Sequence, residues 1–478
     1  MTGRLRSGNG HLDGVLGGGL PANGITLITG LPGAGKTIVA QQYVFRNASP
    51  DRPAVYLSTV SEPLEKILHF GQTLDFFDRA EIGRSVFYED LGLTVSRDGL
   101  AGVADRIGTL LRERRPGVIV IDSFKALQAF AEGPGEFRKF LHDLTGRLTA
   151  VPAASLWVGE YGESEIAAMP EFAVADAIVN LAVVQMGNRE IRLLNVSKLR
   201  GSGFQSGRHA YRLSSQGIQV FPRLADLPSP AEYALGGARV SSGIAALDEM
   251  IGDGYWPGAS TLVVGPSGSG KTIMGLHFIV GGARRGEPGV IATLQENPSQ
   301  LSRMARGFGW SVDEPSVELM YRSPVDIYID QWVYEVLEAV DRTNARRVLV
   351  DSLMDLQVAS PDETRFREFV YSLTQRFSRQ GVSMLMTMEA TEPAAAHRLS
   401  DLAISHLAEN VIMLSHDMGP ASQMRSMAVI KTRASEHADS IRSFEIGPAG
   451  ITLAADPAQE LGGLPGDHSE PGLLRPGV

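Results

Sequence analysis

Short apolar runs alternate with amphipathic stretches through most of the chain. In the first half, apolar runs predict buried strands at ITLIT (25–29), AVYLS (54–58), PGVIVIDS (116–123) and AASLWV (153–158). Helical apolar spacing separates them, at EPLEKILHF (62–70), RDGLAGVADRIGTLLRER (97–114) and GEFRKFLHDLTGRLTA (135–150). Strands that alternate with helices predict an α/β fold, with a mostly parallel sheet and helices on both of its faces.

The pattern changes near residue 177, where short apolar segments alternate with turn residues as they do in β-hairpins. These segments are AIVNLAVVQ (177–185), EIRLLNVSK (190–198), HAYRLS (209–214) and GIQVF (217–221). They predict an antiparallel extension at one edge of the sheet. The second half repeats the order, through GVIATL (289–294), RRVLVDS (346–352) and VSMLMTME (382–389) to hairpins that end at SFEIG (443–447).

The lead-in to each half is also repeated. Ser7 matches Ser242 and Lys36 matches Lys271, both at an offset of 235 residues (271 − 36 = 235). An internal duplication explains the match, with each half about the size of a single α/β domain. The expected boundaries are a first domain at 1–221, a Pro- and Gly-rich linker at 222–240, a second domain at 241–455, and a disordered or partner-binding tail at 456–478.

Each half carries a glycine-rich loop between a strand and a helix. The loops GLPGAGKT (30–37) and GPSGSGKT (265–272) fit the phosphate-binding pattern G-x-x-x-x-G-K-[ST]. In this setting, backbone N–H groups and the positive end of the helix face one anion. The lysines are expected to reach the outer phosphates of ATP, and the threonine hydroxyls to bind Mg²⁺. The expected ATP-binding residues are Gly33, Ala34, Gly35, Lys36, Thr37, Gly268, Ser269, Gly270, Lys271 and Thr272.

Acids near other strand ends complete the expected sites. Asp122 and Asp351 end apolar strands, where a P-loop ATPase places the carboxylate of its Mg²⁺ shell. The alternative is a strand end whose Asp-Ser pair caps a helix. We expect Lys271 and Asp351 to take part in catalysis in the second half.

Hydrolysis also needs a carboxylate that orients or deprotonates water. The loop after the second strand offers Glu296 in the second half, beside Gln295. In the first half this pair is Val60-Ser61, and the nearest acid is Glu62. The second site is therefore predicted to be capable of hydrolysis, and the first is predicted to be impaired or to depend on Glu62. The alternative for Glu296 is a carboxylate that only stabilises the start of a helix.

A basic pair lies on a strand near the end of each half. The four residues are Lys198, Arg200, Lys431 and Arg433. In a ring of subunits they could reach the neighbour's phosphates, as an arginine finger does. The alternative is a solvated strand edge that carries lysine to resist aggregation.

The composition narrows the classes of function. The 478 residues carry a formal net charge of −10, which argues against a protein that grips nucleic acid by bulk electrostatics. Cysteine is absent, which excludes disulfides, a thiol nucleophile and a cysteine-based metal site. The first ten residues, MTGRLRSGNG, lack the apolar core of a secretory signal, and no apolar run is long enough to cross a membrane. We therefore expect a cytoplasmic protein.

Taken together, these motifs resemble the KaiC family, the RecA-like double-domain ATPases of the circadian clock and their relatives. The segments that carry the resemblance are GGGLP before the first loop, VSSGIAALDEM, ARRVLVDS, KLRG and KTRA. The resemblance implies two tandem RecA-like P-loop domains, a two-tiered homohexamer with ATP at subunit interfaces, slow ATP hydrolysis, and Ser/Thr autophosphorylation in the second domain. It also implies that Asp122 and Asp351 are the magnesium-shell acids and that the basic pairs contact the neighbour's nucleotide.

The chain departs from the family pattern at two places. The family's tandem glutamates fall on Val60-Ser61 and on Gln295-Glu296, which puts hydrolysis in the first domain in doubt. The family's adjacent Ser-Thr phosphorylation pair falls on Ser405-His406, and a third acceptor falls on Ser400. A two-site phosphorylation cycle is therefore not expected, whereas modification of Ser405 alone stays open.

Three functions remain in competition. The first is an ATP-hydrolysing, self-phosphorylating hexamer. The second is a nucleotide-gated scaffold, in which ATP assembles the ring and recruits an unknown signalling partner with negligible hydrolysis. The third is a DNA motor related to recombinases and helicases, which the negative charge disfavours.

Overall fold

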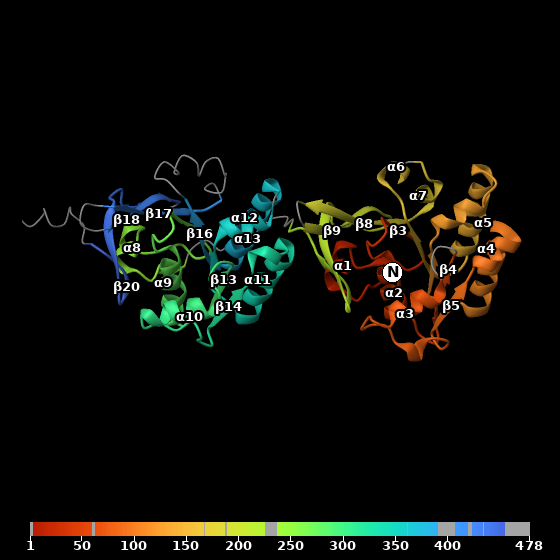
Figure 1. The fold of residues 1–478 in the computed structure, drawn as a ribbon, viewed down its shortest axis with the longest axis horizontal. Coiled ribbons are helices and arrows are strands. Elements are labelled where there is room, and N and C mark those ends of the chain that lie inside the picture. The colour runs from red at the N-terminus through yellow and green to blue at the C-terminus, as the bar shows by residue number, and fades with distance from the viewer. Residues whose placement is uncertain are drawn as a thin grey trace, which may run out of the picture. The chain divides into compact units, whose positions relative to one another are not determined.

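The chain folds into two compact units, Met1–Arg223 and Leu224–Val478 (Figure 1). The computed structural model describes residues 3–59, 63–166, 168–186, 189–224, 237–360, 362–390, 407–418, 423–433 and 435–454. Most of the expected linker, at 225–236, lies outside this range, as does the tail from 455. Within the described residues, no helix is both long and apolar enough to cross a bilayer.

The first unit contains the predicted alternation of strands and helices. Its strands are β1 (Arg4–Leu5), β2 (Leu20–Pro21), β3 (Ile25–Gly30), β4 (Ala54–Ser58), β5 (Val86–Asp90), β6 (Val118–Asp122), β7 (Ala154–Gly159), β8 (Ala177–Met186), β9 (Arg189–Leu199), β10 (Arg208–Ser214) and β11 (Gly217–Phe221). Its helices are α1 (Gly10–Val15), α2 (Lys36–Asn47), α3 (Leu64–Gly71), α4 (Gly92–Arg114), α5 (Pro134–Thr149), α6 (Glu163–Ile166) and α7 (Pro170–Val174), with 3₁₀ turns η1 (Arg79–Glu81) and η2 (Lys125–Phe130).

The second unit repeats this order. Its strands are β12 (Ser260–Gly265), β13 (Gly289–Thr293), β14 (Val317–Tyr321), β15 (Arg347–Asp351), β16 (Ser383–Glu389), β17 (Asn410–Met418), β18 (Gln423–Thr432), β19 (Arg442–Gly447) and β20 (Gly450–Leu453). Its helices are α8 (Ala245–Met250), α9 (Lys271–Ala283), α10 (Pro298–Gly307), α11 (Ile329–Thr343), α12 (Leu353–Ala359) and α13 (Glu363–Gln380), with the 3₁₀ turn η4 (Pro324–Asp326).

Both units are built on a nine-stranded sheet of the same topology. The first sheet has the order β11-β10-β9-β8-β3-β7-β6-β4-β5, and the second has β20-β19-β18-β17-β12-β16-β15-β13-β14. In each, six strands are parallel and the last three along the chain extend one edge in antiparallel pairs. The predicted fold class, a mostly parallel α/β sheet with an antiparallel edge, is confirmed. The sequence patterns had not identified the edge strands β5 and β14.

Helices cover both faces of each sheet, so the central strands are apolar on both sides. On β3, Leu27 faces the apolar cluster that contains α4 and α5, whereas the next residue, Ile28, faces the cluster that contains α2. In the second unit, α11 and α13 cover one face and α9 the other. This arrangement places the helix that follows each glycine-rich loop, α2 or α9, against the middle of its sheet.

The described ends of the expected linker pack against the second unit. Leu224 is 7% exposed and joins the cluster with α11 and α13. The backbone of Val240 pairs with that of Tyr255 through two hydrogen bonds of 2.8 Å, and the guanidinium of Arg239 lies 3.6 Å from the ring centroid of Trp256.

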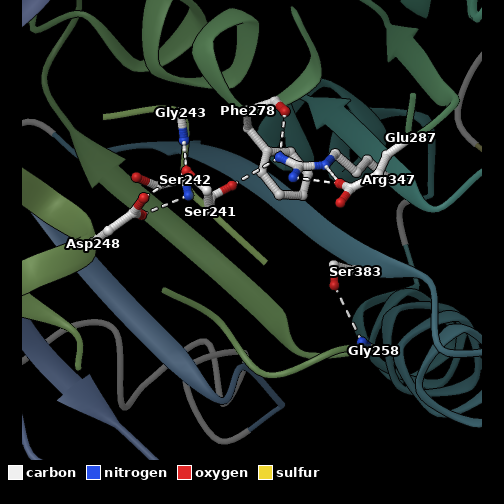
Figure 2. A network of polar contacts seen from close by, with 9 residues as sticks. All are labelled: Ser241, Ser242, Gly243, Asp248, Gly258, Phe278, Glu287, Arg347 and Ser383. Atoms are coloured by element: carbon white, nitrogen blue, oxygen red, sulfur yellow. Dashed lines mark hydrogen bonds and ion pairs between the residues drawn. The ribbon is translucent and has the colours of Figure 1, made fainter. Parts of the chain in front are cut away.

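A buried arginine ties the start of the second unit to α9 (Figure 2). Arg347, the first residue of β15, is fully buried, and its Nη1 donates to the carbonyls of Ser241 (2.8 Å) and Phe278 (2.7 Å). Its Nε donates to Glu287 at 2.6 Å. Because α9 begins at the glycine-rich loop, this network fixes the helix that carries Lys271 and Thr272.

Candidate functional site

Both glycine-rich loops run from the end of a central strand into the first turn of a helix. Gly33 (φ 77°) and Gly35 (φ 87°) adopt left-handed backbone conformations, as do Gly268 (φ 75°) and Gly270 (φ 101°). A side chain in this region would be strained, which explains the glycines. A Cβ atom added to Gly33 or Gly268 would meet nothing within 4 Å, so this side of each loop is open to a ligand.

The two lysines point into their own loops. Nζ of Lys36 donates to the carbonyl of Leu31 at 2.9 Å, and Nζ of Lys271 donates to those of Gly265 (2.9 Å) and Pro266 (2.8 Å). Burial lowers the pKa of both ammonium groups, and nearby carboxylates oppose the shift. A phosphate that entered the loop would add negative charge beside each ammonium group and so favour its charged form.

The expected magnesium residues meet in both units. Oγ1 of Thr37 donates to Oδ2 of Asp122 at 2.8 Å, and Oγ1 of Thr272 donates to Oδ2 of Asp351, also at 2.8 Å. The threonine belongs to the helix after the loop, and the aspartate ends the strand two places along the sheet. The sequence placed these residues in one site, and the fold brings them into contact.

The surroundings of the two aspartates differ. The hydroxyl of Tyr56 donates to Asp122 at 2.6 Å, whereas that of Thr387 donates to Asp351. Burial raises the pKa of Asp351, against the hydrogen bonds from Thr387 and Thr272 and the charge of Lys271. A cation at this point would favour the ionised carboxylate.

The residues fit a magnesium ion that is shared with phosphates. Mg²⁺ prefers oxygen ligands and is usually held by one or two carboxylates together with substrate phosphates and water. Across the described ranges no group of three or more His, Asp or Glu side chains is placed to hold a metal by itself. The Thr-Asp pair therefore suits an ion that arrives with the nucleotide.

The expected water-orienting acids are only partly described. Glu296 lies directly before Asn297, which caps α10 through a capping box with Gln300. The hydroxyl of Thr293 bonds both the N–H and the carbonyl of Glu296 at 3.2 Å, so the turn fixes its backbone. The first-half acid Glu62 and the neighbouring Val60-Ser61 lie outside the described residues, as do the expected phosphoacceptors Ser400 and Ser405.

The basic pairs lie far from the loop of their own unit. In the sheet, Lys198 of β9 lies opposite Ile178 of β8. Ile178 in turn lies opposite Leu27 of β3, three residues before the end of that strand. Three residues span about 10 Å along a strand, and β9 lies two strands away from β3. The ammonium of Lys198 donates to the carbonyls of Phe172 (3.2 Å) and Ala173 (3.0 Å), close to the amino ends of the parallel strands.

The other members of these pairs occupy matching positions. Arg200 donates to Asp176 at 3.3 Å, and Lys431 donates to the carbonyl of Ala408 at 2.8 Å. The backbone N–H of Arg433 donates to the carbonyl of Glu409 at 3.0 Å. None of these described contacts reaches the glycine-rich loop of the same unit.

Two kinds of site residue had not been predicted. Arg192, on β9, donates to the carbonyl of Gly33 at 2.7 Å and pairs with Glu190 at 2.8 Å. Glu160 follows the last residue of β7, and Glu389 ends β16. The signal for the latter two was present in the sequence, because SLWVGE and MLMTME both end an apolar strand in an acid.

Comparison with known proteins gives matches over both units. A family model described as "ATPase: KaiC" matches residues 5–225 and 240–458. The circadian clock oscillator protein KaiC of Rippkaea orientalis is 26% identical over 462 residues, covering 92% of this chain and 87% of that protein. The circadian clock protein KaiC3 of Synechocystis is 28% identical over 471 residues, covering 94% of this chain and 91% of that protein.

Proposed function

Because the chain belongs to the KaiC family of ATPases, we propose that each unit binds ATP with Mg²⁺ and that the protein hydrolyses ATP slowly. The observation that carries this proposal is the repeated Thr-Asp contact, at 2.8 Å in both units. It joins the first turn of the phosphate-binding helix to the strand end where a magnesium-shell acid is needed.

Each residue type has a role in the proposed reaction. The loop N–H groups and the helix end hold the phosphates, and Lys36 or Lys271 neutralises the outer ones. Thr37 with Asp122, and Thr272 with Asp351, would hold Mg²⁺, which draws charge from the β- and γ-phosphate oxygens when it is bound. In the second unit Glu296 would orient the attacking water.

Phosphate release from Mg-ATP tests this function. The wild-type chain is compared with Lys36→Ala, Lys271→Ala and the double variant. We expect each single variant to keep part of the activity and the double variant to fall to background. A wild type that binds ATP without releasing phosphate would reject the ATPase and favour a scaffold.

We further propose a ring in which ATP lies at subunit interfaces, as KaiC family proteins typically form hexamers. The position of Lys198, Arg200, Lys431 and Arg433, remote from the loops of their own units, supports this. Sedimentation with and without Mg-ATP tests the assembly. A monomer at micromolar concentration under both conditions would reject it.

Self-phosphorylation at Ser405 is a finer proposal, and it rests on the sequence position of this serine alone. Intact-mass spectrometry after incubation with Mg-ATP tests it. The expected result is one added phosphate on the wild type and none on Lys271→Ala or Ser405→Ala. A wild type that gains no phosphate would reject self-phosphorylation.

The scaffold remains the second candidate, since Val60 and Ser61 replace the acids that a water-activating loop needs in the first unit. In that case the first unit would bind ATP to hold the ring together, and a ring face would recruit a protein partner. Retention of assembly in a variant that has lost all hydrolysis would favour this function.

A further inference from the structure

A second carboxylate lies beside the phosphate-binding lysine of the first unit. It comes from β7, which lies between the loop strand β3 and the strand β6 that ends in Asp122. Oε1 of Glu160, the residue after β7, is 3.7 Å from Nζ of Lys36. Because the strands are parallel, their carboxyl ends place Glu160, Asp122 and the loop at one edge of the sheet.

The second unit has an acid at the matching place. Glu389 pairs in register with Gly265, the first residue of the second loop. The offset from Glu160 to Glu389 is the same as that from Asp122 to Asp351 (389 − 160 = 351 − 122 = 229). The acid is thus a repeated part of the site.

Electrostatic interactions agree with this placement. Burial lowers the pKa of Lys36, and Glu160 opposes the shift more strongly than Asp122 does. Glu389 likewise acts on Lys271 more strongly than Asp351 does. The lysine is expected to contact the outer phosphates, so a carboxylate this close to its ammonium group lies near the position of the γ-phosphate.

Besides its contact with Lys36, the Glu160 carboxylate is also accessible to water in a way that Asp122 is not. Its side chain is 54% exposed, although that of Lys36 is only 8% exposed. Asp122 instead accepts hydrogen bonds from Thr37 and Tyr56. Glu160 therefore reaches from the buried lysine toward solvent, as a water-binding carboxylate must.

We propose that Glu160 orients the attacking water in the first ATP site, where Val60-Ser61 offer no acid. This inference rests on the proposed ATPase function. The water oxygen forms a bond to the γ-phosphorus as the bond from that atom to the β–γ bridging oxygen breaks. The electron pair of the broken bond stays on ADP. One water proton remains on the new phosphate hydroxyl, and the other passes through the Glu160 carboxylate to solvent.

The test isolates the first site in chains that carry Lys271→Ala. Glu160→Gln is compared with Glu165→Gln, an acid in the nearby helix α6 whose carboxylate pairs with Lys125 at 2.7 Å. We expect Glu160→Gln to lower kcat by about 100-fold or more, with the Kd for ATP changed only a few-fold. Glu165→Gln should keep the parent rate. Glu160→Ala, which removes the carboxylate altogether, should behave like Glu160→Gln.

Other results overturn the inference. Undiminished hydrolysis in Glu160→Gln would overturn it. A loss of turnover in Glu62→Gln, with turnover in Glu160→Gln unaffected, would overturn it as well. A Lys271→Ala parent that releases no phosphate, while the wild type does, would reject a working first site and leave the ATPase function standing. Absence of hydrolysis in the wild type would instead reject the function itself.

Discussion

At the scale of single residues, the two units use different side chains to accept an equivalent backbone hydrogen bond. In the first unit, Oε1 of Gln42 accepts the N–H of Ile218 at 2.9 Å. At the matching place in the second unit, Nε2 of His277 accepts the N–H of Ile451 at 2.8 Å. The imidazole must be neutral to accept this bond.

We predict that His277 makes the second unit sensitive to acid. Burial lowers its pKa to about 4, with the charge of Arg284 adding to the shift and the Gly243 carbonyl opposing it. The ordinary pKa is about 6.5. Between these two pKa values the unfolded chain binds a proton that the native chain does not. The free energy of unfolding is therefore unaffected by His277 above the unfolded-state pKa, and it decreases as the pH falls toward the folded-state pKa.

Urea unfolding between about pH 7 and pH 5 measures this effect. The His277→Gln variant, which copies Gln42, should lose about 2 kcal/mol less unfolding free energy over that range than the wild type does. Trp310 reports the local change, because its ring lies 4.5 Å from that of His277. Equal pH dependence in the two proteins would show that protonation of His277 does not govern it.

The sequence predicted the residues that belong to a motif and missed those defined by the fold alone. Lys36, Thr37 and Asp122 were assigned because a loop pattern and an apolar strand mark them. Arg192 carries no pattern of its own. Glu160 follows an apolar strand, but only the order of strands shows that this strand end lies beside the loop. That order comes from tertiary pairing, which no local stretch of sequence encodes.

At the scale of elements, the helix after each loop is anchored through equivalent carbonyls. Nδ2 of Asn47 donates to the carbonyls of Arg6 and Tyr43, both at 2.8 Å. In the second unit the matching carbonyls, those of Ser241 and Phe278, are bonded by Arg347 (Figure 2). The position of Asn47 is occupied there by a glycine, Gly282, because a Cβ on it would lie 2.3 Å from Cδ of Arg347.

We predict that the two anchors can be exchanged. Arg347→Val alone should destabilise the second unit by about 3 kcal/mol, since it leaves two carbonyls and Glu287 without their donor. Gly282→Asn alone should also destabilise, through the clash with Arg347. The double variant should recover part of the loss, because the asparagine can then copy Asn47. A double variant as unstable as the sum of the single ones, by urea unfolding, would contradict the exchange.

The order of elements was predictable further than their packing. Apolar runs and glycine-rich loops indicated a parallel sheet with an antiparallel edge, and the fold has both. The strands β5 and β14 were missed because VFYED and VELMY are short and mostly half-buried, so neither forms a distinct apolar run. The anchor could not have been predicted, since Arg347 lies far along the chain from the carbonyls that it bonds.

At the scale of the whole molecule, the proposed sharing of ATP sites between subunits predicts complementation between damaged subunits. Two variants are made in chains that already carry Lys36→Ala. In the first, Lys271→Ala disables the second glycine-rich loop. In the second, Lys431→Ala with Arg433→Ala removes the basic pair that would contact the neighbour's nucleotide. In mixed rings, the first variant can supply the basic pair to the loop of the second. At equal mixing about a quarter of the interfaces should be intact.

Phosphate release by the mixture measures this recovery. A control mixture of Lys271→Ala with Asp351→Asn should stay inactive, because both changes damage the loop side of the same site. Activity of the first mixture no greater than that of its separate components would show that the basic pairs do not act between subunits.

If one chain holds two ATP sites, the number of ATP molecules bound per chain will show it. Equilibrium dialysis with labelled ATP and Mg²⁺ gives this number for the wild type, Lys36→Ala, Lys271→Ala and the double variant. We expect two for the wild type, one for each single variant and none for the double variant. A double variant that binds as much ATP as the wild type would contradict this expectation.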